Sequence, residues 1–285
     1  MKLDEESSMN KLVSLIVLFI FASCSNQTKQ AENETQVKRY LHISHTRTNS
    51  NPKLDSVAEQ LNLKRYDMLW LGGDLAQLTS ADDSTILHVD SIFNLSSSTT
   101  LWSLGNHDYT DVERVQKITK RPPYYSYHQN GMTIVVLDTQ DSLSNMIGKQ
   151  KDFLFGVLDT LKESSYLVLL HHKLIWMYNH VDLEKRVSSI SNAGFGDCFY
   201  CINPNNFNSG VYPKLVELKQ RGVEVICIGG DIGFKIKEFE YLSAEGVYFL
   251  ASGIHAGEEG NKALVFSHNV DKQELSWEFV RLKDL

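Results

Sequence analysis

The chain has 285 residues, 42% of them hydrophobic and 22% charged, which is typical of a folded globular protein with one large domain or two small ones. Its 28 basic and 35 acidic residues give a formal net charge of −7, so the broad basic surface of a nucleic-acid-binding protein is excluded. An anionic substrate is not excluded, because a bound metal ion dominates the electric field around it.

The N-terminus is predicted to be a targeting segment. Residues 12–22 form an apolar run with the length of a signal-peptide core, which is too short to span a bilayer. The run ends at Phe21-Ala22-Ser23-Cys24, which resembles a bacterial lipobox with Phe in place of the usual Leu. We expect residues 1–24 to be a lipoprotein signal peptide whose Cys24 is lipidated, and residues 25–36 to be a flexible tether. A plain secretory signal or a buried helix is the alternative.

The chain then alternates predicted strands and helices. Apolar segments at 37–44, 67–71 and 99–104 predict buried strands, and apolar residues at helical spacing from Leu54 predict a helix after the first of them. A second helix fits within residues 84–93.

A hairpin and a further strand–helix unit are predicted next. Residues 124–127 and 132–138 are joined through Asn130-Gly131, which is a typical hairpin turn. Apolar residues between Leu154 and Leu161 follow helical spacing, and residues 166–170 predict another buried strand.

Residues 173–210 interrupt this alternation. The segment is rich in Asn, Ser and Gly, and it carries Cys198 and Cys201. We interpret it as an insertion at the strand ends that forms a lid or specificity loop. In an oxidising cell envelope the two cysteines are expected to form a structural disulfide.

The rest of the chain changes from alternation to consecutive strands. A helix is expected between Pro213 and Gly222, followed by a buried strand at 223–228. Four short strands are then predicted, at 235–241, 247–251, 263–267 and 275–281. This order favours an α/β fold in which two sheets pack together with helices outside.

Polar residues follow the predicted strands in a recurring way. They occur in Leu71-Gly72-Gly73-Asp74, Leu104-Gly105-Asn106-His107-Asp108, Leu170-His171-His172 and Ile228-Gly229-Gly230-Asp231. One such sequence is compatible with a plain polar turn. Four of them favour a site, because open α/β sheets hold their sites at the carboxyl ends of strands.

With His45 and Arg47 after the first strand, this order resembles the calcineurin-like metallophosphoesterase family. The family pattern is Asp-x-His, Gly-Asp, Gly-Asn-His-Asp/Glu, a lone His and Gly-His-x-His, and the resemblance extends from residue 37 to about 282. Gly73-Asp74 and Leu104–Asp108 match it fully. The resemblance implies a four-layer αββα sandwich over residues 37–285 and a metal-dependent phosphoesterase activity.

The first and last motifs depart from the family. His45 stands where the family has Asp, and Arg47 stands where it has His. Asp231 replaces the first His of the last motif and Gly233 the second. A register shifted by one residue would place Gly230 and Ile232 there instead, and we prefer the register that keeps Asp231.

Family members bind two metals, and the resemblance implies one complete site here. Its expected ligands are Asp74, Asn106, His171 and Asp231. His171 is preferred to His172 because the family's His directly follows its strand. The other site keeps Asp74 and His45, but Arg47 has no lone pair to offer a metal and instead suits a phosphate oxygen. We therefore expect one divalent ion per chain, of Mn, Fe or Zn.

His107 is expected, from the family, to protonate the leaving oxygen, with Asp108 orienting its imidazole. The predicted function is hydrolysis of a small-molecule or envelope phosphate ester by metal-activated water, in a protein attached to the bacterial cell envelope through its lipid. The alternative is a decayed member of the fold that acts as a binding or scaffold lipoprotein. Monoester or diester specificity and the oligomeric state stay open.

Overall fold

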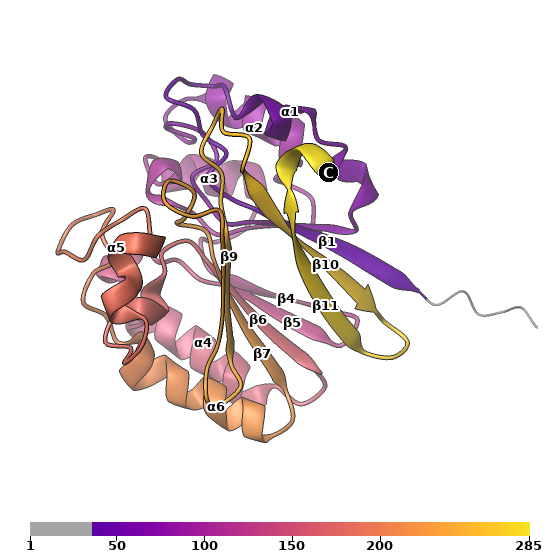
Figure 1. Ribbon diagram of the computed structural model, residues 1–285, viewed down its shortest axis with the longest axis vertical. Coiled ribbons are helices and arrows are strands. Elements are labelled where there is room, and N and C mark those ends of the chain that lie inside the picture. Colours follow the sequence, from indigo (N-terminus) through magenta and orange to yellow (C-terminus); the bar gives the residue numbers. More distant parts are fainter. Residues whose placement is uncertain (1–35) are drawn as a thin grey trace, which may run out of the picture. The chain divides into compact units, whose positions relative to one another are not determined.

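A computed structural model describes residues 36–285, which lie in one compact unit. The expected signal peptide, the lipobox Cys24 and most of the tether lie outside the described residues. Two sheets pack face to face, with α1, α2 and α3 on one outer side and α4 and α6 on the other (Figure 1). The predicted αββα sandwich is confirmed.

The first sheet has the strand order β11-β10-β1-β2-β3. Its three parallel strands come from the start of the chain: β1 (Val37–Ile43), β2 (Met68–Leu71) and β3 (Thr100–Trp102). Two antiparallel strands from the end of the chain complete it: β10 (Lys262–Asn269) and β11 (Glu274–Arg281). Its helices are α1 (Ser56–Gln60), α2 (Asp83–Phe93) and α3 (Val112–Thr119).

The second sheet has the strand order β4-β5-β6-β7-β9-β8. Its strands are β4 (Tyr125–Gln129), β5 (Met132–Val136), β6 (Tyr166–His171), β7 (Glu224–Gly229), β8 (Glu238–Leu242) and β9 (Tyr248–Ser252). Its outer helices are α4 (Gly148–Thr160) and α6 (Tyr212–Gln220). The predicted β4–β5 hairpin forms, and Asn130 and Gly131 both take positive φ, as its tight turn requires.

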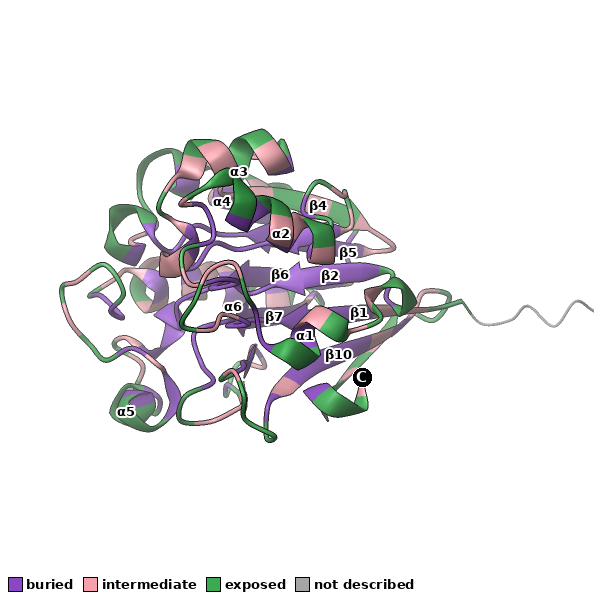
Figure 2. Ribbon diagram, turned by 90° about the horizontal axis from the view of Figure 1, so that it is seen from above, coloured by how far each residue is buried: buried purple, intermediate pink, exposed green. Residues whose placement is uncertain are grey.

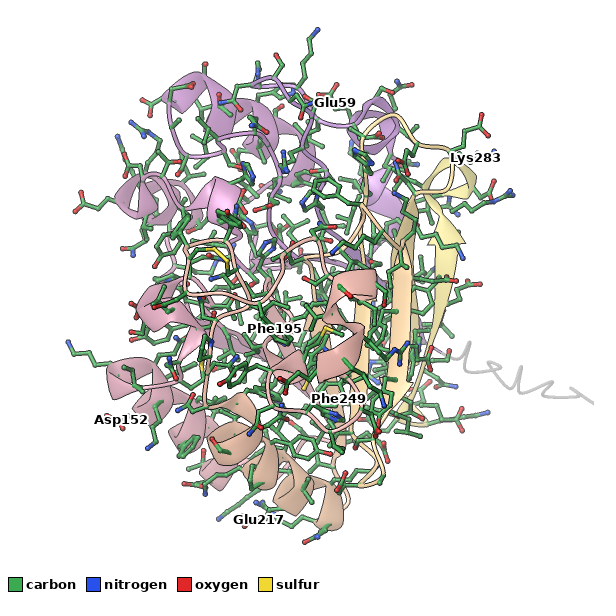
Figure 3. All side chains as sticks on the ribbon, turned by 60° about the vertical axis from the view of Figure 1, so that its left-hand side comes forward. Glu59, Asp152, Phe195, Glu217, Phe249 and Lys283 are labelled. Carbon is green, nitrogen blue, oxygen red and sulfur yellow. A yellow bond between two sulfur atoms is a disulfide. The ribbon has the colours of Figure 1, made fainter. Side chains whose placement is uncertain are left out.

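Apolar residues fill the space between the layers. Trp70, Leu170 and Phe266 belong to a cluster between the two sheets. Two further clusters lie between a sheet and its outer helices, one on each side of the molecule. The inner strands such as β2 and β6 are buried, whereas the edge strand β4 and the outer faces of the helices are exposed (Figure 2). Charged side chains such as Asp152, Glu217 and Lys283 project outward (Figure 3). No helix within residues 36–285 is long and apolar enough to cross a membrane.

Outside the segment 173–210, two helices differ from the sequence-based expectation. Helix α1 spans only five residues, because Leu61 already has extended backbone and Leu54 precedes the N-terminal cap at Asp55. Helix α3 has no counterpart in the prediction, although its Val112, Val115 and Ile118 follow helical spacing; it is only eight residues long.

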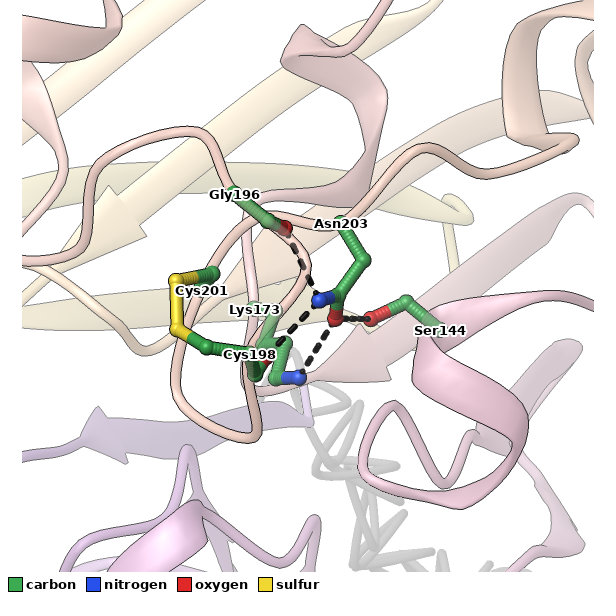
Figure 4. The surroundings of a disulfide bond; sticks show 6 residues. All are labelled: Ser144, Lys173, Gly196, Cys198, Cys201 and Asn203. Atoms are coloured by element: carbon green, nitrogen blue, oxygen red, sulfur yellow. Dashed lines mark hydrogen bonds between the residues drawn. A yellow bond between two sulfur atoms is a disulfide. The ribbon is translucent and has the colours of Figure 1, made fainter.

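A hydrogen bond between Lys173 and Asn203 closes a loop within the segment 173–210. The buried Lys173 donates a hydrogen bond from Nζ to Asn203 Oδ1 at 3.1 Å, and Asn203 Nδ2 donates to the carbonyls of Gly196 and Cys198 (Figure 4). The predicted disulfide between Cys198 and Cys201 is present. The short helix α5 (Val187–Ile190) lies within the segment.

Candidate functional site

The carboxyl ends of strands from both sheets meet at a cavity of about 300 Å³. Six of the eight site residues predicted from sequence line it: His45, Arg47, Asp74, Asn106, His107 and Asp231. The remaining wall comes from Asn192, Ala193, Tyr200 and Phe234. Asp108 and His171, the other two predicted residues, are buried outside this lining.

Two glycines allow the strand ends to approach one another. A Cβ at Gly105 would collide with the carboxylate of Asp74, and a Cβ at Gly230 would collide with the backbone carbonyl of Gly72. Only glycine leaves room at these positions. The Gly-Gly-Asp and Gly-Asn-His sequences are therefore required for packing as much as for chemistry.

Asp74 lies at the centre of the cavity with a side chain that is only 2% exposed. Its Oδ1 accepts the backbone N–H of His107 at 3.0 Å and lies 3.6 Å from His172 Nε2. Its Oδ2 lies 3.4 Å from His45 Nε2 and 3.8 Å from Arg47 Nε. Burial raises the pKa of Asp74, but the surrounding histidines, His172 first, outweigh it and leave this pKa lowered. Asp74 is therefore a carboxylate.

The Oδ2 side of Asp74 holds a cation and an aromatic ring. Arg47 donates from Nη1 to Gln77 Oε1 at 2.7 Å, and its guanidinium lies 5.6 Å from the ring centre of Phe234. Phe234 packs edge-on against His45 with ring centres 4.8 Å apart. Burial lowers the pKa of His45 to about 3, so its imidazole is neutral.

The Oδ1 side of Asp74 faces His172, whereas the predicted ligand His171 is turned away from Asp74. His172 donates from Nδ1 to the Gly72 carbonyl at 2.7 Å, which directs its Nε2 toward Asp74. Among residues 36–285 this buried Nε2 has no hydrogen-bond partner. His172 is therefore the histidine that faces the cavity carboxylate.

His171 points to the other side of the second sheet. Its ring packs edge-on against Trp176 at 4.7 Å between ring centres, and its Nδ1 bonds to the Lys173 carbonyl at 2.8 Å. Leu169, two residues earlier on β6, belongs to the same helix-side cluster as Trp176. Side chains alternate along a strand, so His171 continues the face of Leu169 and His172 takes the other.

The carboxylate of Asp108 binds backbone and hydroxyl groups and makes none of its hydrogen bonds to the His107 imidazole that it was expected to orient. Its buried carboxylate accepts the backbone N–H groups of Asp74 at 2.6 Å, Leu75 at 3.0 Å and Gly105 at 2.8 Å, and the hydroxyl of Thr79. These bonds fix the loops after β2 and β3 against each other.

Gln77, which the sequence did not single out, orients the His107 imidazole. The backbone carbonyl of Gln77 accepts from His107 Nδ1 at 2.6 Å. With Nδ1 engaged in this way, Nε2 is the nitrogen of His107 left for a ligand. Because Gln77 also accepts from Arg47 through its side chain, it positions both residues.

Asp231 completes the wall of the cavity from the second sheet. It is 4% exposed, and its backbone N–H donates to the His172 carbonyl at 3.0 Å. Burial raises its pKa. The preferred register of the last motif therefore puts a carboxyl group in the cavity, together with Asn106 from the loop after β3.

Two donors of the cavity have the spacing of ligands to one divalent ion. No three His, Cys, Asp or Glu side chains of the described chain form a ready-made metal cluster. Asp74 Oδ1 and the unpartnered His172 Nε2 lie 3.6 Å apart, a spacing that two ligands of one ion have when each is about 2.1 Å from it. On the Oδ2 side the Arg47 guanidinium repels a second dication.

Three aromatic or amide residues of the cavity were missed from the sequence. Phe234 directly follows the last strand-end motif, Asn192 lies in the segment 173–210, and Tyr200 lies between the two cysteines. Only their proximity to a motif or to the disulfide marks them. Their residue types alone do not distinguish them from core or surface residues.

Comparison with known proteins gives a likeness of fold. No protein-family model matches the chain, and no curated protein matches it. A dimetal phosphatase from Danio rerio superposes with a TM-score of 0.50 at 11% identity, over 81% of this chain and 95% of that one. These values support the metallophosphoesterase-type sandwich fold, and they show nothing about the activity of this chain.

Two other solved structures show weaker likeness. A 5′-nucleotidase precursor from Thermus thermophilus has a TM-score of 0.43 at 13% identity, over 86% of this chain and 54% of that one. The NAD nucleotidase of Haemophilus influenzae has a TM-score of 0.40 at 15% identity, over 85% and 49%. This chain thus spans about half the length of either nucleotidase.

Proposed function

We propose that this chain hydrolyses a phosphate ester in the Asp74 cavity with the help of one divalent metal ion. The observation that carries the proposal is the asymmetry of one buried carboxylate: both oxygens lie near an imidazole nitrogen, but only Oδ2 also lies near a guanidinium. Such a place accepts one cation beside a group that binds anions. The phosphatase fold supports the same chemistry.

Each residue of the cavity has a distinct role in this proposal. Asp74 and His172 would hold the ion, with Asn106 and Asp231 on the same cavity wall. When bound, a divalent ion supplies Lewis-acid polarisation of the phosphoryl group and lowers the pKa of water.

Arg47 binds and orients the phosphoryl oxygens, since its Nε is buried and lacks a hydrogen-bond partner in the described part of the chain. His107, held at Nδ1 by the Gln77 carbonyl, presents Nε2 to donate a proton to the leaving oxygen.

The test is metal content together with hydrolysis. Protein purified without chelator is expected to hold one ion per chain and to release p-nitrophenol from p-nitrophenyl phosphate when Mn²⁺ or Zn²⁺ is present. EDTA should abolish the reaction, and the same ion should restore it. Neither bound metal nor hydrolysis under saturating Mn²⁺ or Zn²⁺ would overturn the proposal and favour a scaffold.

We also propose that the enzyme lies in the bacterial cell envelope, with a small-molecule or envelope phosphate ester as its substrate. The support is the sequence at Cys24, which lies before the described residues. Cys24→Ala is expected to move the protein from the membrane fraction to the soluble fraction, or to leave it unprocessed. Unchanged fractionation would show that the lipobox interpretation is wrong.

A further inference from the structure

A second cavity adjoins the first across a wall of two shared side chains. It has a volume of about 370 Å³, and Arg47 and Phe234 line both cavities. The first cavity contains Asp74, His107 and Asp231, whereas the second contains none of these groups. A phosphate held on Arg47 therefore has room on two sides, one with catalytic groups and one without.

The second cavity is polar and without an uncompensated anion of its own. Its walls include Thr48 and Asn49 from the loop after β1, Ser56 from the start of α1, and His255 from the loop after β9. The Asp55 carboxylate in this wall accepts three backbone N–H groups, so its charge is already satisfied. Hydroxyl, amide and imidazole groups around an open space suit a ligand with hydroxyl groups.

The cavity with the catalytic groups has a different character. Tyr200, Phe234 and Ala193 give it apolar surface beside His107, so its walls suit the alcohol that is released. A phosphate monoester has one organic substituent and would occupy this cavity alone. The polar cavity across Arg47 would then hold only water.

Building on the proposed phosphoesterase function, we propose that the substrate is a phosphodiester whose retained alcohol is hydroxylated, such as a glycerol or sugar unit. Its phosphate lies on Arg47, its leaving alcohol in the Asp74 cavity and its retained alcohol in the polar cavity. Arg47 is thus positioned to bind a diester monoanion that extends to both sides.

The reaction balances with water as the only co-substrate. Water oxygen forms a bond to phosphorus, and the bond from phosphorus to the leaving oxygen breaks. The leaving alcohol takes the proton of His107 Nε2, and the proton released by the water passes to solvent, from which His107 is protonated again. The products are an alcohol and a phosphomonoester of the retained hydroxylated alcohol.

The test uses three substrates with one leaving group: p-nitrophenyl phosphate, methyl p-nitrophenyl phosphate and glyceryl p-nitrophenyl phosphate. The glyceryl diester is expected to have the highest kcat/KM, about tenfold or more above the methyl diester, because its hydroxyl groups gain one or two hydrogen bonds in the polar cavity. Equal values for the two diesters, or a preference for the monoester, would overturn the proposal.

Ala256→Trp serves as the variant, since residue 256 lines the polar cavity and lies outside the catalytic one. The large side chain is expected to remove the advantage of the glyceryl over the methyl diester and to leave p-nitrophenyl phosphate hydrolysis unchanged. Ala244→Trp is the matched control, because it lies in a cavity that contains no residue of either site.

The outcomes separate this inference from the function on which it rests. Hydrolysis of all three substrates without a glyceryl advantage contradicts the diester proposal and keeps the phosphoesterase. No hydrolysis of any substrate contradicts both. A glyceryl advantage that Ala256→Trp leaves intact shows that the polar cavity is not the binding place, and so overturns the assignment.

Discussion

The two oxygens of the Asp74 carboxylate lie near different groups. Oδ1 lies near the Nε2 of His172 and accepts a backbone N–H, whereas Oδ2 lies near the Nε2 of His45 and a guanidinium next to a phenyl ring. A bridging carboxylate between two metals would have similar surroundings on both sides. Arg47 stands where the metallophosphoesterase pattern has His, and it adds to the Oδ2 side a guanidinium that the Oδ1 side lacks.

Asp74→Asn is expected to have the largest effect because both halves depend on this carboxylate. Hydrolysis should fall by more than about 10⁴-fold, beyond the range of about 10²–10⁴ for one proton donor, and metal should be lost. Steady-state kinetics and metal analysis measure this, with the thermal midpoint as a check of folding. A folded variant that keeps both metal and activity would show that the Asp74 carboxylate is needed for neither.

His107→Asn tests the proton donor separately from the metal. Turnover is expected to fall by about 10²–10⁴-fold while bound metal is unchanged, because the side chain interacts with Gln77 and not with the proposed ion. Calorimetric titration with Mn²⁺ gives the second readout. An equal loss of metal would show that His107 is a ligand.

Neighbouring histidines provide a matched pair for the Oδ1 side. His172→Ala is expected to weaken metal binding by about 100-fold or more, since even groups that only orient a ligand cost about 10- to 100-fold. His171→Ala should leave the affinity unchanged and lower stability through the lost packing on Trp176. If metal titrations show the reverse pattern, His171 is the metal ligand, as the sequence predicted.

Arg47→Ala tests the Oδ2 side. The KM for phosphate ester is expected to rise by about 10- to 100-fold, which corresponds to the loss of hydrogen bonds to a charged group. Metal should stay bound, because the variant removes a positive charge and no ligand. Arg47→Lys is the control, and it should recover only part of the loss, since a lysine cannot bind two oxygens in the planar arrangement. Loss of metal in Arg47→Ala would contradict the proposal that Oδ1 faces the metal and Oδ2 faces the phosphate-binding guanidinium.

The smallest effect concerns His42, a buried residue outside the Asp74 cavity. Its titration affects how the free energy of unfolding depends on pH. Burial, with His171 nearby, lowers the pKa of His42 to about 3, and its Nδ1 bonds to Ser252 Oγ at 2.8 Å. The unfolded imidazole has a pKa of about 6.5, so between these values the unfolded chain binds the extra proton. Stability is therefore complete above about pH 6.5 and declines as the pH falls toward about 3.

His42→Gln is expected to reduce this slope by up to about 1.4 kcal/mol per pH unit. Denaturant unfolding at a series of pH values between about 7 and about 4, which spans most of this titration range, gives the free energy of unfolding for both proteins. A slope that the substitution does not change would show that His42 does not titrate in this way.

The strands and the polar sequences after them could be predicted because both depend on local patterns. Apolar runs of about four to eight residues bounded by glycine predicted the buried strands, and the polar residues after them placed Asp74 and His107 in one cavity. The sequence favoured His171 over His172, and the two side chains lie on opposite faces because a shift of one residue at the end of β6 reverses the face.

The role of Asp108 depends on contacts that no local pattern contains. Its carboxylate accepts backbone N–H groups from residues 33 and 34 positions earlier in the chain. The same holds for Gln77 and for Tyr200, which reaches the cavity from the segment after β6. Long-range packing decides these positions, and a single sequence does not specify it.

The hydrogen bond between Lys173 and Asn203 has a consequence for how this protein can diversify. It joins the two ends of a loop whose interior reaches the cavity through Tyr200, while the ends stay next to His172. A loop closed at its base tolerates changes of length and sequence between its ends at small entropic cost. Residues 195–200 are mostly exposed, whereas Leu174, Trp176 and Leu183 are buried in the helix-side core. This exposed tip is therefore the part in which new substrate preferences can evolve, or be grafted, without displacing the groups around Asp74.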